Sequence, residues 1–144
     1  MKLRSPLPEL DGATAWINGQ VTKKDLLGEK PVLIHFWSVS CHLCKESMPD
    51  LNQFLKKYKD QLNVVAVHIP RSEEDMDLDN VKRTAEALNM TQPIFVDHEF
   101  VLSDLFENEY VPSYYVFDRS GLLRHYQAGG KGIKMLEQRV ERIL

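Results

Sequence analysis

Residues 31–49 read PVLIHFWSVSCHLCKESMP, and this stretch decides the fold of the 144-residue chain. Its first seven residues form a nearly unbroken apolar run, which is typical of a strand that is covered on both faces of its sheet. From Leu43 to Tyr58, apolar side chains recur at steps of three to five residues, which predicts a helix with one buried face. Two cysteines, Cys41 and Cys44, lie where this helix begins.

The same two patterns continue on both sides of this stretch. The predicted strands cover residues 13–17 and 20–22, paired as a hairpin around the Asn18-Gly19 turn, and residues 31–37, 61–69, 93–96, 113–118 and 122–127. The predicted helices cover residues 23–27, 41–58, 81–90, 101–106 and 133–144. This alternation predicts an α/β fold, formed by one domain over residues 1–144, with a central mixed sheet and helices on both faces.

Composition and charge exclude several classes of protein. The 18 Lys and Arg residues and the 21 Asp and Glu residues give a net charge of −3, which argues against a surface that binds nucleic acid. No apolar run reaches the roughly 18–20 residues of a membrane-spanning helix. The chain start lacks the apolar segment of a secretory signal. We therefore expect a cytoplasmic protein without a membrane span, or an extracytoplasmic one if a leader has been removed.

The spacing Cys41-His42-Leu43-Cys44 points to redox chemistry. The free N–H groups at a helix start stabilise an anion, so we expect the pKa of the Cys41 thiol to lie below its ordinary value. A thiolate is the attacking species in thiol–disulfide exchange. Cys44 lies one helical turn further on, within reach of Cys41 and more shielded. The pair therefore supplies an exposed nucleophile and a resolving thiol.

Two other interpretations of the pair remain. With two further ligands, the cysteines form half of a zinc or copper site, but the five histidines show no paired spacing, and His68 is the candidate for a third ligand. As buried residues on one helix face, the cysteines need no chemistry at all. The strand before the pair and the helix after it favour redox chemistry, without a metal or another cofactor.

Residues 32–49 resemble the active-site segment of the thioredoxin superfamily, most closely its TlpA/ResA-like branch, which is near the AhpC/TSA redoxin proteins. Pro49 is similar to the proline that kinks the helix in this family, and Val111-Pro112-Ser113 resembles its cis-proline loop. The predicted hairpin at residues 13–22 resembles the branch's N-terminal extension. The resemblance implies a thioredoxin-like three-layer fold with an N-terminal β-hairpin, and the activity of a thiol–disulfide oxidoreductase.

The resemblance also implies roles for the matching residues. Cys41 is then the nucleophile and Cys44 the resolving thiol, while a cis peptide bond at Pro112 places the Val111 backbone beside the sulfurs, where an extended substrate pairs with it. Further substrate contacts are expected from His42 and Trp37. The implied partners are a protein or small-molecule thiol or disulfide and a separate redox partner that recycles the chain, which we expect to be a monomer.

Three positions depart from the family's pattern. Ser40 replaces the usual Trp before the first cysteine and is suited to cap the helix. His35 replaces the family's buried acid; it is either a catalytic group that accepts the proton of Cys44 or a hydrogen-bonded structural histidine. Ser47 replaces an acid of the ResA-like branch, and the neighbouring Glu46 is expected to face away from the sulfurs.

Other activities compete with disulfide exchange. A peroxiredoxin-type thiol peroxidase would use Cys41 against a peroxide, with Ser38 nearby, but Ile34 stands where that family has proline. The changes at positions 35 and 40 also fit an interaction module without activity. The direction of exchange depends on His42, which either stabilises the Cys41 thiolate or donates a hydrogen bond as a neutral ring.

The acidic residues from Asp75 to Asp79, followed by Glu86, mimic a calcium-binding loop. Such a loop requires glycine at its sixth position, which here is Asn80. We therefore expect a solvated helix start instead of a metal site.

Overall fold

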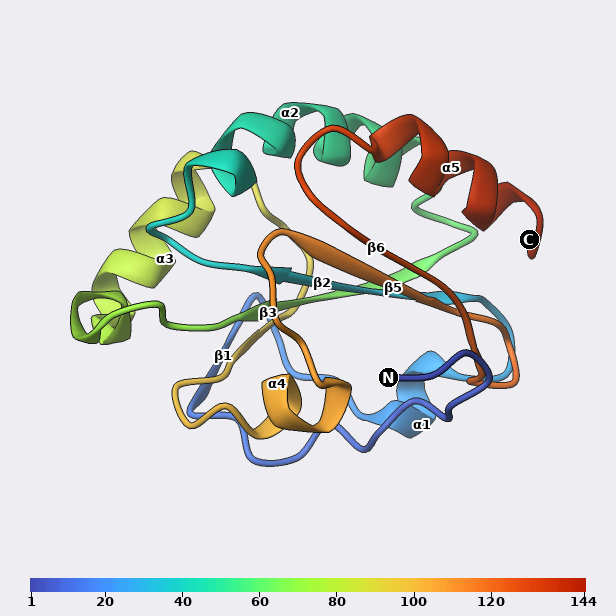
Figure 1. Cartoon of the computed structure of the whole chain (residues 1–144), viewed down its shortest axis with the longest axis horizontal. Helices are drawn as coiled ribbons and strands as arrows, with labels where there is room; N and C mark the ends of the chain where they lie inside the picture. The colour runs from blue at the N-terminus through green and yellow to red at the C-terminus, as the bar shows by residue number, and fades with distance from the viewer.

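The computed structural model describes residues 1–144, in which one six-stranded sheet lies between two layers of helices (Figure 1). The strands are β1 (Ala15–Ile17), β2 (Val32–Trp37), β3 (Asn63–His68), β4 (Ile94–Val96), β5 (Ser113–Phe117) and β6 (Leu123–Ala128). The helices are α1 (Lys23–Leu26), α2 (His42–Lys57), α3 (Leu78–Ala87), α4 (Val101–Phe106) and α5 (Ile133–Glu141), with a short 3₁₀ helix, η1, at Glu73–Met76. The predicted α/β fold with a mixed sheet is confirmed.

The strands lie in the order β1-β4-β3-β2-β5-β6. β2, β3 and β4 are parallel, whereas β1, β5 and β6 run antiparallel to their neighbours. All six residues of β2 are buried, as the unbroken apolar run of this central strand predicts. Because Trp37 of β2 pairs with His68 of the parallel strand β3, the loops that follow these two residues leave the sheet at the same edge.

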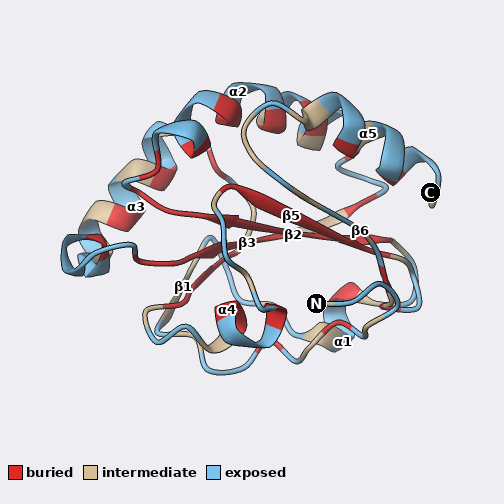
Figure 2. Cartoon of the chain, viewed as in Figure 1, coloured by how far each residue is buried: buried red, intermediate tan, exposed pale blue.

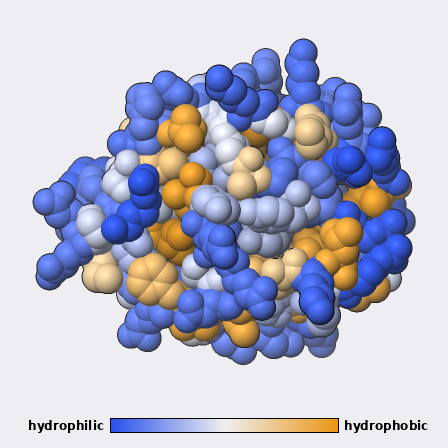
Figure 3. Space-filling view, in the orientation of Figure 1, coloured by the Kyte–Doolittle hydropathy of each residue, from blue (hydrophilic) through white to orange (hydrophobic).

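Helices cover both faces of this sheet. Leu33 and Trp37 of β2 pack into the core beneath α2, α3 and α5, whereas Ile34 and Phe36 pack into the core beneath α1 and α4. Figure 2 shows that the central strands β2 and β5 are buried along their length, whereas the helices are buried only where they face the sheet. On the face in Figure 3, apolar atoms reach the surface in separate patches among hydrophilic side chains. No helix combines the length and apolar character that a membrane span requires.

The predicted N-terminal hairpin is wrong. β1 pairs with β4 in antiparallel register, and residues 20–22 form no strand. Asn18 and Gly19 do adopt positive φ angles of 64° and 106°, as the predicted turn requires. The Asn18 side chain, however, donates to the carbonyl oxygens of Met90 and Gln92, at 2.9 and 3.1 Å. These long-range bonds attach the turn to the segment before β4 instead of to a second strand.

The segment before α3 also differs from the prediction. α3 begins at Leu78 because Asp77 caps it, accepting a hydrogen bond from the backbone N–H of Asn80 at 3.3 Å. The residues just before Asp77, Glu73–Met76, form η1, which the apolar pattern does not predict. Asp75 is buried within this turn, with 4 % of its surface exposed, so the expected solvated helix start is wrong for this residue.

Candidate active site

The two cysteines lie at the N-terminus of α2, beyond the edge where β2 ends. They are joined by a disulfide, with their Cα atoms 5.2 Å apart. Cys41 is the N-cap residue, and its Sγ accepts a hydrogen bond from the backbone N–H of Cys44 at 3.1 Å. Cys41 retains 2 % exposure and Cys44 none. The order of accessibility is as predicted, but Cys41 is less exposed than the sequence indicates.

The loop between α4 and β5 accounts for this low exposure. Its Val111–Pro112 peptide bond is cis, as predicted. The carbonyl oxygen of Val111 lies 3.7 Å from the Sγ atom of Cys41, so the backbone of this loop lies beside that sulfur. The carbonyl of Pro112 accepts a hydrogen bond from the backbone N–H of Gly129 at 2.9 Å, which connects the loop to the end of β6.

Asn108 attaches this loop to β5. Its Oδ1 atom accepts hydrogen bonds from the hydroxyls of Ser113, at 2.6 Å, and Tyr115, at 2.8 Å. Its Nδ2 atom donates to the carbonyl oxygen of Tyr110 at 3.0 Å. Ser113 and Tyr115 are buried, so one amide satisfies two buried hydroxyls and closes the loop that carries Val111. The sequence did not single out Asn108, since asparagine is common in polar loops.

His35 lies in the middle of the sheet, opposite Tyr114 of β5. Its ring is fully buried and stacks on the Tyr114 ring, with centroids 5.0 Å apart and an angle of 5° between the planes. Neither ring nitrogen has a hydrogen-bond partner, so the interpretation of His35 as a hydrogen-bonded structural histidine is wrong. Burial lowers the pKa of His35 to about 3, because desolvation disfavours the imidazolium. The ring is therefore neutral at physiological pH.

The His35 ring faces the same core as Cys44. Side chains alternate along a strand, so His35 shares a face of β2 with Leu33 and Trp37, whose core also contains Cys44. Burial raises the pKa of the Tyr114 hydroxyl to about 12, against a smaller lowering by the Ser47 hydroxyl. The core that contains Cys44 therefore holds a neutral His35 ring whose nitrogens have no hydrogen-bond partner.

Of the two side chains that were expected to contact substrate, Trp37 is buried and His42 is exposed. Trp37 is fully buried with its ring 5.0 Å from that of His68, so the prediction of a substrate contact is wrong; the last residue of a central strand is covered by the helical layer. The side chain of His42 is 81 % exposed and its Nε2 lies 2.8 Å from Oε1 of Glu46. His42 therefore pairs with Glu46 and makes no hydrogen bond with Cys41, while Glu46 faces solvent as predicted.

The loop between β2 and Cys41 is held by residues at the end of β3. The hydroxyl of Ser38 donates to the carbonyl oxygen of Ile69 at 2.5 Å, and the backbone N–H of Val39 donates to Nε2 of His68 at 3.1 Å. Because Nε2 accepts this bond, His68 is neutral and carries its proton on Nδ1. Burial lowers the pKa of His68 to about 4. The sequence indicated His68 only as a possible metal ligand.

Ser40 is not the helix cap that the sequence indicates, because Cys41 takes that position. Its hydroxyl donates instead to Oδ2 of the buried Asp75 at 2.7 Å. The same oxygen accepts a hydrogen bond from the backbone N–H of Arg71 at 2.8 Å. The sequence could not indicate this contact, since its two residues are 35 positions apart and no periodic pattern connects them.

The structure lends no support to a metal site. No three His, Cys, Asp or Glu side chains gather closely enough to hold a metal ion. The Nε2 atom of His68 accepts the Val39 N–H bond.

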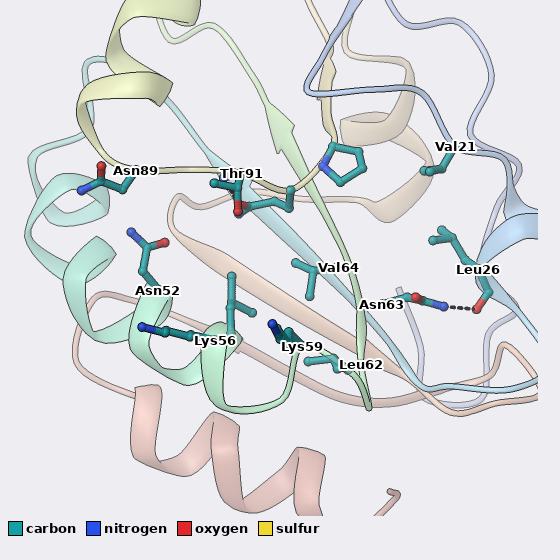
Figure 4. Close-up of a pocket in the computed structure, with 13 residues that line it drawn as sticks. Val21, Leu26, Asn52, Lys56, Lys59, Leu62, Asn63, Val64, Asn89 and Thr91 are labelled. Atoms are coloured by element: carbon teal, nitrogen blue, oxygen red, sulfur yellow. Dashed lines mark hydrogen bonds between the residues drawn. The ribbon is translucent and has the colours of Figure 1, made fainter.

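A cavity of about 510 Å³ lies at the other end of the sheet, along the last turns of α2 and the start of β3 (Figure 4). Two of its polar side chains are already used: the amides of Asn52 and Asn63 donate to the carbonyl oxygens of Leu88 and Leu26, at 2.8 and 2.9 Å. None of the predicted site residues lines this cavity. The candidate active site is therefore the disulfide and the loops around it.

Comparisons with known proteins agree with this geometry. The AhpC/TSA family matches residues 4–126. The chain belongs to this family. Thiol-disulfide oxidoreductase YkuV of Bacillus subtilis (strain 168) is 66 % identical to the chain over 144 residues, which is 100 % of the chain and 97 % of YkuV. Thioredoxin-like protein YneN of the same organism is 30 % identical over 118 residues, which is 82 % of the chain and 67 % of YneN.

Solved structures of similar proteins share the fold. A thioredoxin-like protein whose solution structure is known in the oxidized form is 66 % identical, with a TM-score of 0.91 over 99 % of the chain and 97 % of that protein. A thioredoxin-like superfamily protein at 21 % identity has the same fold, with a TM-score of 0.83 over 96 % of the chain and 95 % of that protein. The chain is a TlpA/ResA-like thiol–disulfide oxidoreductase of the thioredoxin superfamily.

Proposed function

We propose that Cys41 is the nucleophile and Cys44 the resolving thiol in dithiol exchange with protein disulfides. One observation carries the proposal: Cys41 Sγ accepts the Cys44 N–H at the start of α2, while Cys44 is sealed from solvent. A hydrogen bond donated to sulfur, together with the helix N-terminus, stabilises a thiolate. Access favours first attack by Cys41, which retains 2 % exposure, over Cys44, which has none.

The exchange has two steps. In the reduced chain, the Cys41 thiolate attacks one sulfur of a substrate disulfide, whose S–S bond breaks as the other sulfur leaves as a thiolate and takes a proton from water. The Cys44 sulfur then attacks Sγ of Cys41, which breaks the mixed disulfide, and the Cys44 proton passes to the second substrate sulfur as it leaves. Two electrons pass to the substrate, and the chain is left with the Cys41–Cys44 disulfide. A separate dithiol restores the reduced form.

The surroundings of the disulfide support a peptide substrate. The carbonyl of Val111, held beside Cys41 at 3.7 Å by the cis-Pro112 loop, offers a backbone acceptor to an extended chain. Tyr110, next to Val111, and Leu43, between the cysteines, are 60 % and 48 % exposed. We propose that these apolar side chains and the exposed His42 contact the polypeptide on either side of the substrate cysteine.

We further propose that His35 assists the second step. Cys44 is a buried thiol in the mixed disulfide, and the neutral His35 ring in the same core has an unused nitrogen lone pair. Because burial lowers its pKa to about 3, the ring is a hydrogen-bond acceptor that holds the Cys44 proton only during its transfer.

The assignment is tested with the two cysteine variants. Cys41→Ser should abolish reduction of insulin disulfides, because no nucleophile remains. Cys44→Ser should still attack and should accumulate mixed disulfides, each with one copy of the chain. We propose that the chain acts in the cytoplasm as a monomer, so complexes trapped in cells should be recovered from the cytoplasmic fraction. Mixed disulfides that accumulate with Cys41→Ser instead would reverse the roles of the two cysteines.

A further inference from the structure

The carboxylate of Asp75 is held against the residue that precedes Cys41. We propose that Asp75 tunes the reactive thiol: its negative charge opposes formation of the Cys41 thiolate and so makes the cysteine pair a stronger reductant. The proposal rests on the proposed function, in which Cys41 is the reacting thiol. Asp75 would be a positioning residue that acts through the field at the site, without touching the substrate.

The geometry fixes this carboxylate firmly. Asp75 is 4 % exposed, and its Oδ2 accepts hydrogen bonds from the Ser40 hydroxyl at 2.7 Å and the Arg71 backbone N–H at 2.8 Å. Ser40 is covalently linked to Cys41, so the first of these bonds attaches the carboxylate to the start of the motif. The family usually has Trp at position 40. In this chain the shorter Ser40 side chain allows the Asp75 carboxylate to approach the backbone before Cys41.

The charge of this carboxylate is not neutralised by an ion pair. Both of its hydrogen-bond donors are uncharged groups, and none of the four ion pairs of the structure includes Asp75. The Arg71 guanidinium lies 3.5 Å from the Ser40 carbonyl oxygen, to which it donates. The Asp75 charge does reach neighbouring groups: it raises the pKa of His68 against the stronger lowering by burial, while His98 lowers that pKa further.

Two fields of opposite sign therefore act on Cys41. The N-terminus of α2 and the Cys44 N–H stabilise the thiolate, whereas a carboxylate without a counter-ion in a poorly screened position destabilises it. A dithiol protein whose reduced form is stabilised is a stronger oxidant. Asp75, which destabilises the thiolate of the reduced form, should shift the pair in the opposite direction.

The variant that tests this is Asp75→Asn. Since both hydrogen bonds end on Oδ2, the amide oxygen can occupy that place and keep both while the charge is removed. We expect the acid dissociation constant of the Cys41 thiol to rise by roughly three- to tenfold, measured by thiolate absorbance. In glutathione buffers, the ratio of dithiol to disulfide form should rise in the same direction. Glu74→Gln, an exposed acid of the same turn, is the control and should change neither quantity.

Two further variants make the test decisive. Ser40→Ala removes the hydrogen bond but keeps the carboxylate, so its effect on the Cys41 dissociation constant should be smaller than that of Asp75→Asn. Asp75→Ser is a second neutral variant if the amide disturbs folding, which near-ultraviolet circular dichroism would reveal. Unchanged dissociation and glutathione equilibria in a folded neutral variant would overturn the proposal. Reduction of insulin by the wild-type chain, measured alongside, shows that the proposed function holds. Unchanged equilibria in the variant then reject only the role of Asp75.

Discussion

His35 places a neutral imidazole where this family usually has a carboxyl group, and its contribution can be separated from that of the cysteines. His35→Phe keeps an aromatic ring to stack on Tyr114 and removes the lone pair available to the Cys44 proton. We expect the first attack by Cys41 to keep its rate and the resolution of the mixed disulfide to slow by roughly tenfold to a hundredfold. Stopped-flow measurement of the mixed-disulfide lifetime checks this.

A matched variant supplies the control. His35→Asp restores a proton acceptor of the family's kind and should recover resolution with a changed dependence on pH. If His35→Phe resolves the mixed disulfide at the wild-type rate with an unchanged pH profile, His35 is a packing residue only.

The residues of the site that could be predicted are those whose positions follow from local sequence. Cys41 and Cys44 are placed by a strand followed directly by a helix, and Pro112 by its position before a strand. Ser40 and Asp75 could not be placed, because their contact joins two loops through the fold. The burial of Trp37 follows from the apolar run of β2, and this burial rules out the substrate contact that the resemblance suggested.

Among the elements, the α4–β5 loop offers the clearest test, because one side chain attaches it to the sheet. Asn108→Ala would leave the Ser113 and Tyr115 hydroxyls buried without their acceptor. Each unsatisfied group costs about 1–3 kcal/mol, so we expect the two hydroxyls together to lower the free energy of unfolding by about 2–6 kcal/mol. The freed Val111 backbone should also raise KM for a peptide disulfide more than it lowers kcat.

The control for this loop is Asn108→Asp, which keeps both accepted hydrogen bonds and loses the one donated to Tyr110. It should retain most of the stability and show a smaller rise in KM. Urea denaturation and steady-state kinetics on one substrate give both quantities. Equal KM values for wild type and Asn108→Ala would mean that the loop keeps its position without this amide.

Elements with a strong periodic pattern were predicted well, and those that depend on partners were not. β2 and α2 follow from the apolar runs in residues 31–58, and the structure confirms both with small changes at their ends. The hairpin failed because β1 pairs with β4, far away in sequence, although Asn18 and Gly19 keep the backbone angles of the expected turn. η1 has too few residues to create a period.

At the scale of the whole molecule, two buried histidines connect stability to pH. Burial lowers the pKa of His35 to about 3 and that of His68 to about 4, while the unfolded chain binds protons at the ordinary value of about 6.5. Between these values the unfolded chain binds more protons than the folded one. The free energy of unfolding must therefore fall as pH falls below about 6.5, and this loss continues until the folded values are reached.

The size of the effect can be estimated. At pH 5 each histidine lies about 1.5 pH units below its unfolded pKa, so each costs roughly 2 kcal/mol, and the pair roughly 4 kcal/mol. Guanidinium denaturation at pH values from 7.5 to 5 should show this decrease. In His35→Phe one of the two groups is absent, so the decrease should shrink to about half. An equally steep decrease in this variant would mean that the acid sensitivity arises from groups other than His35.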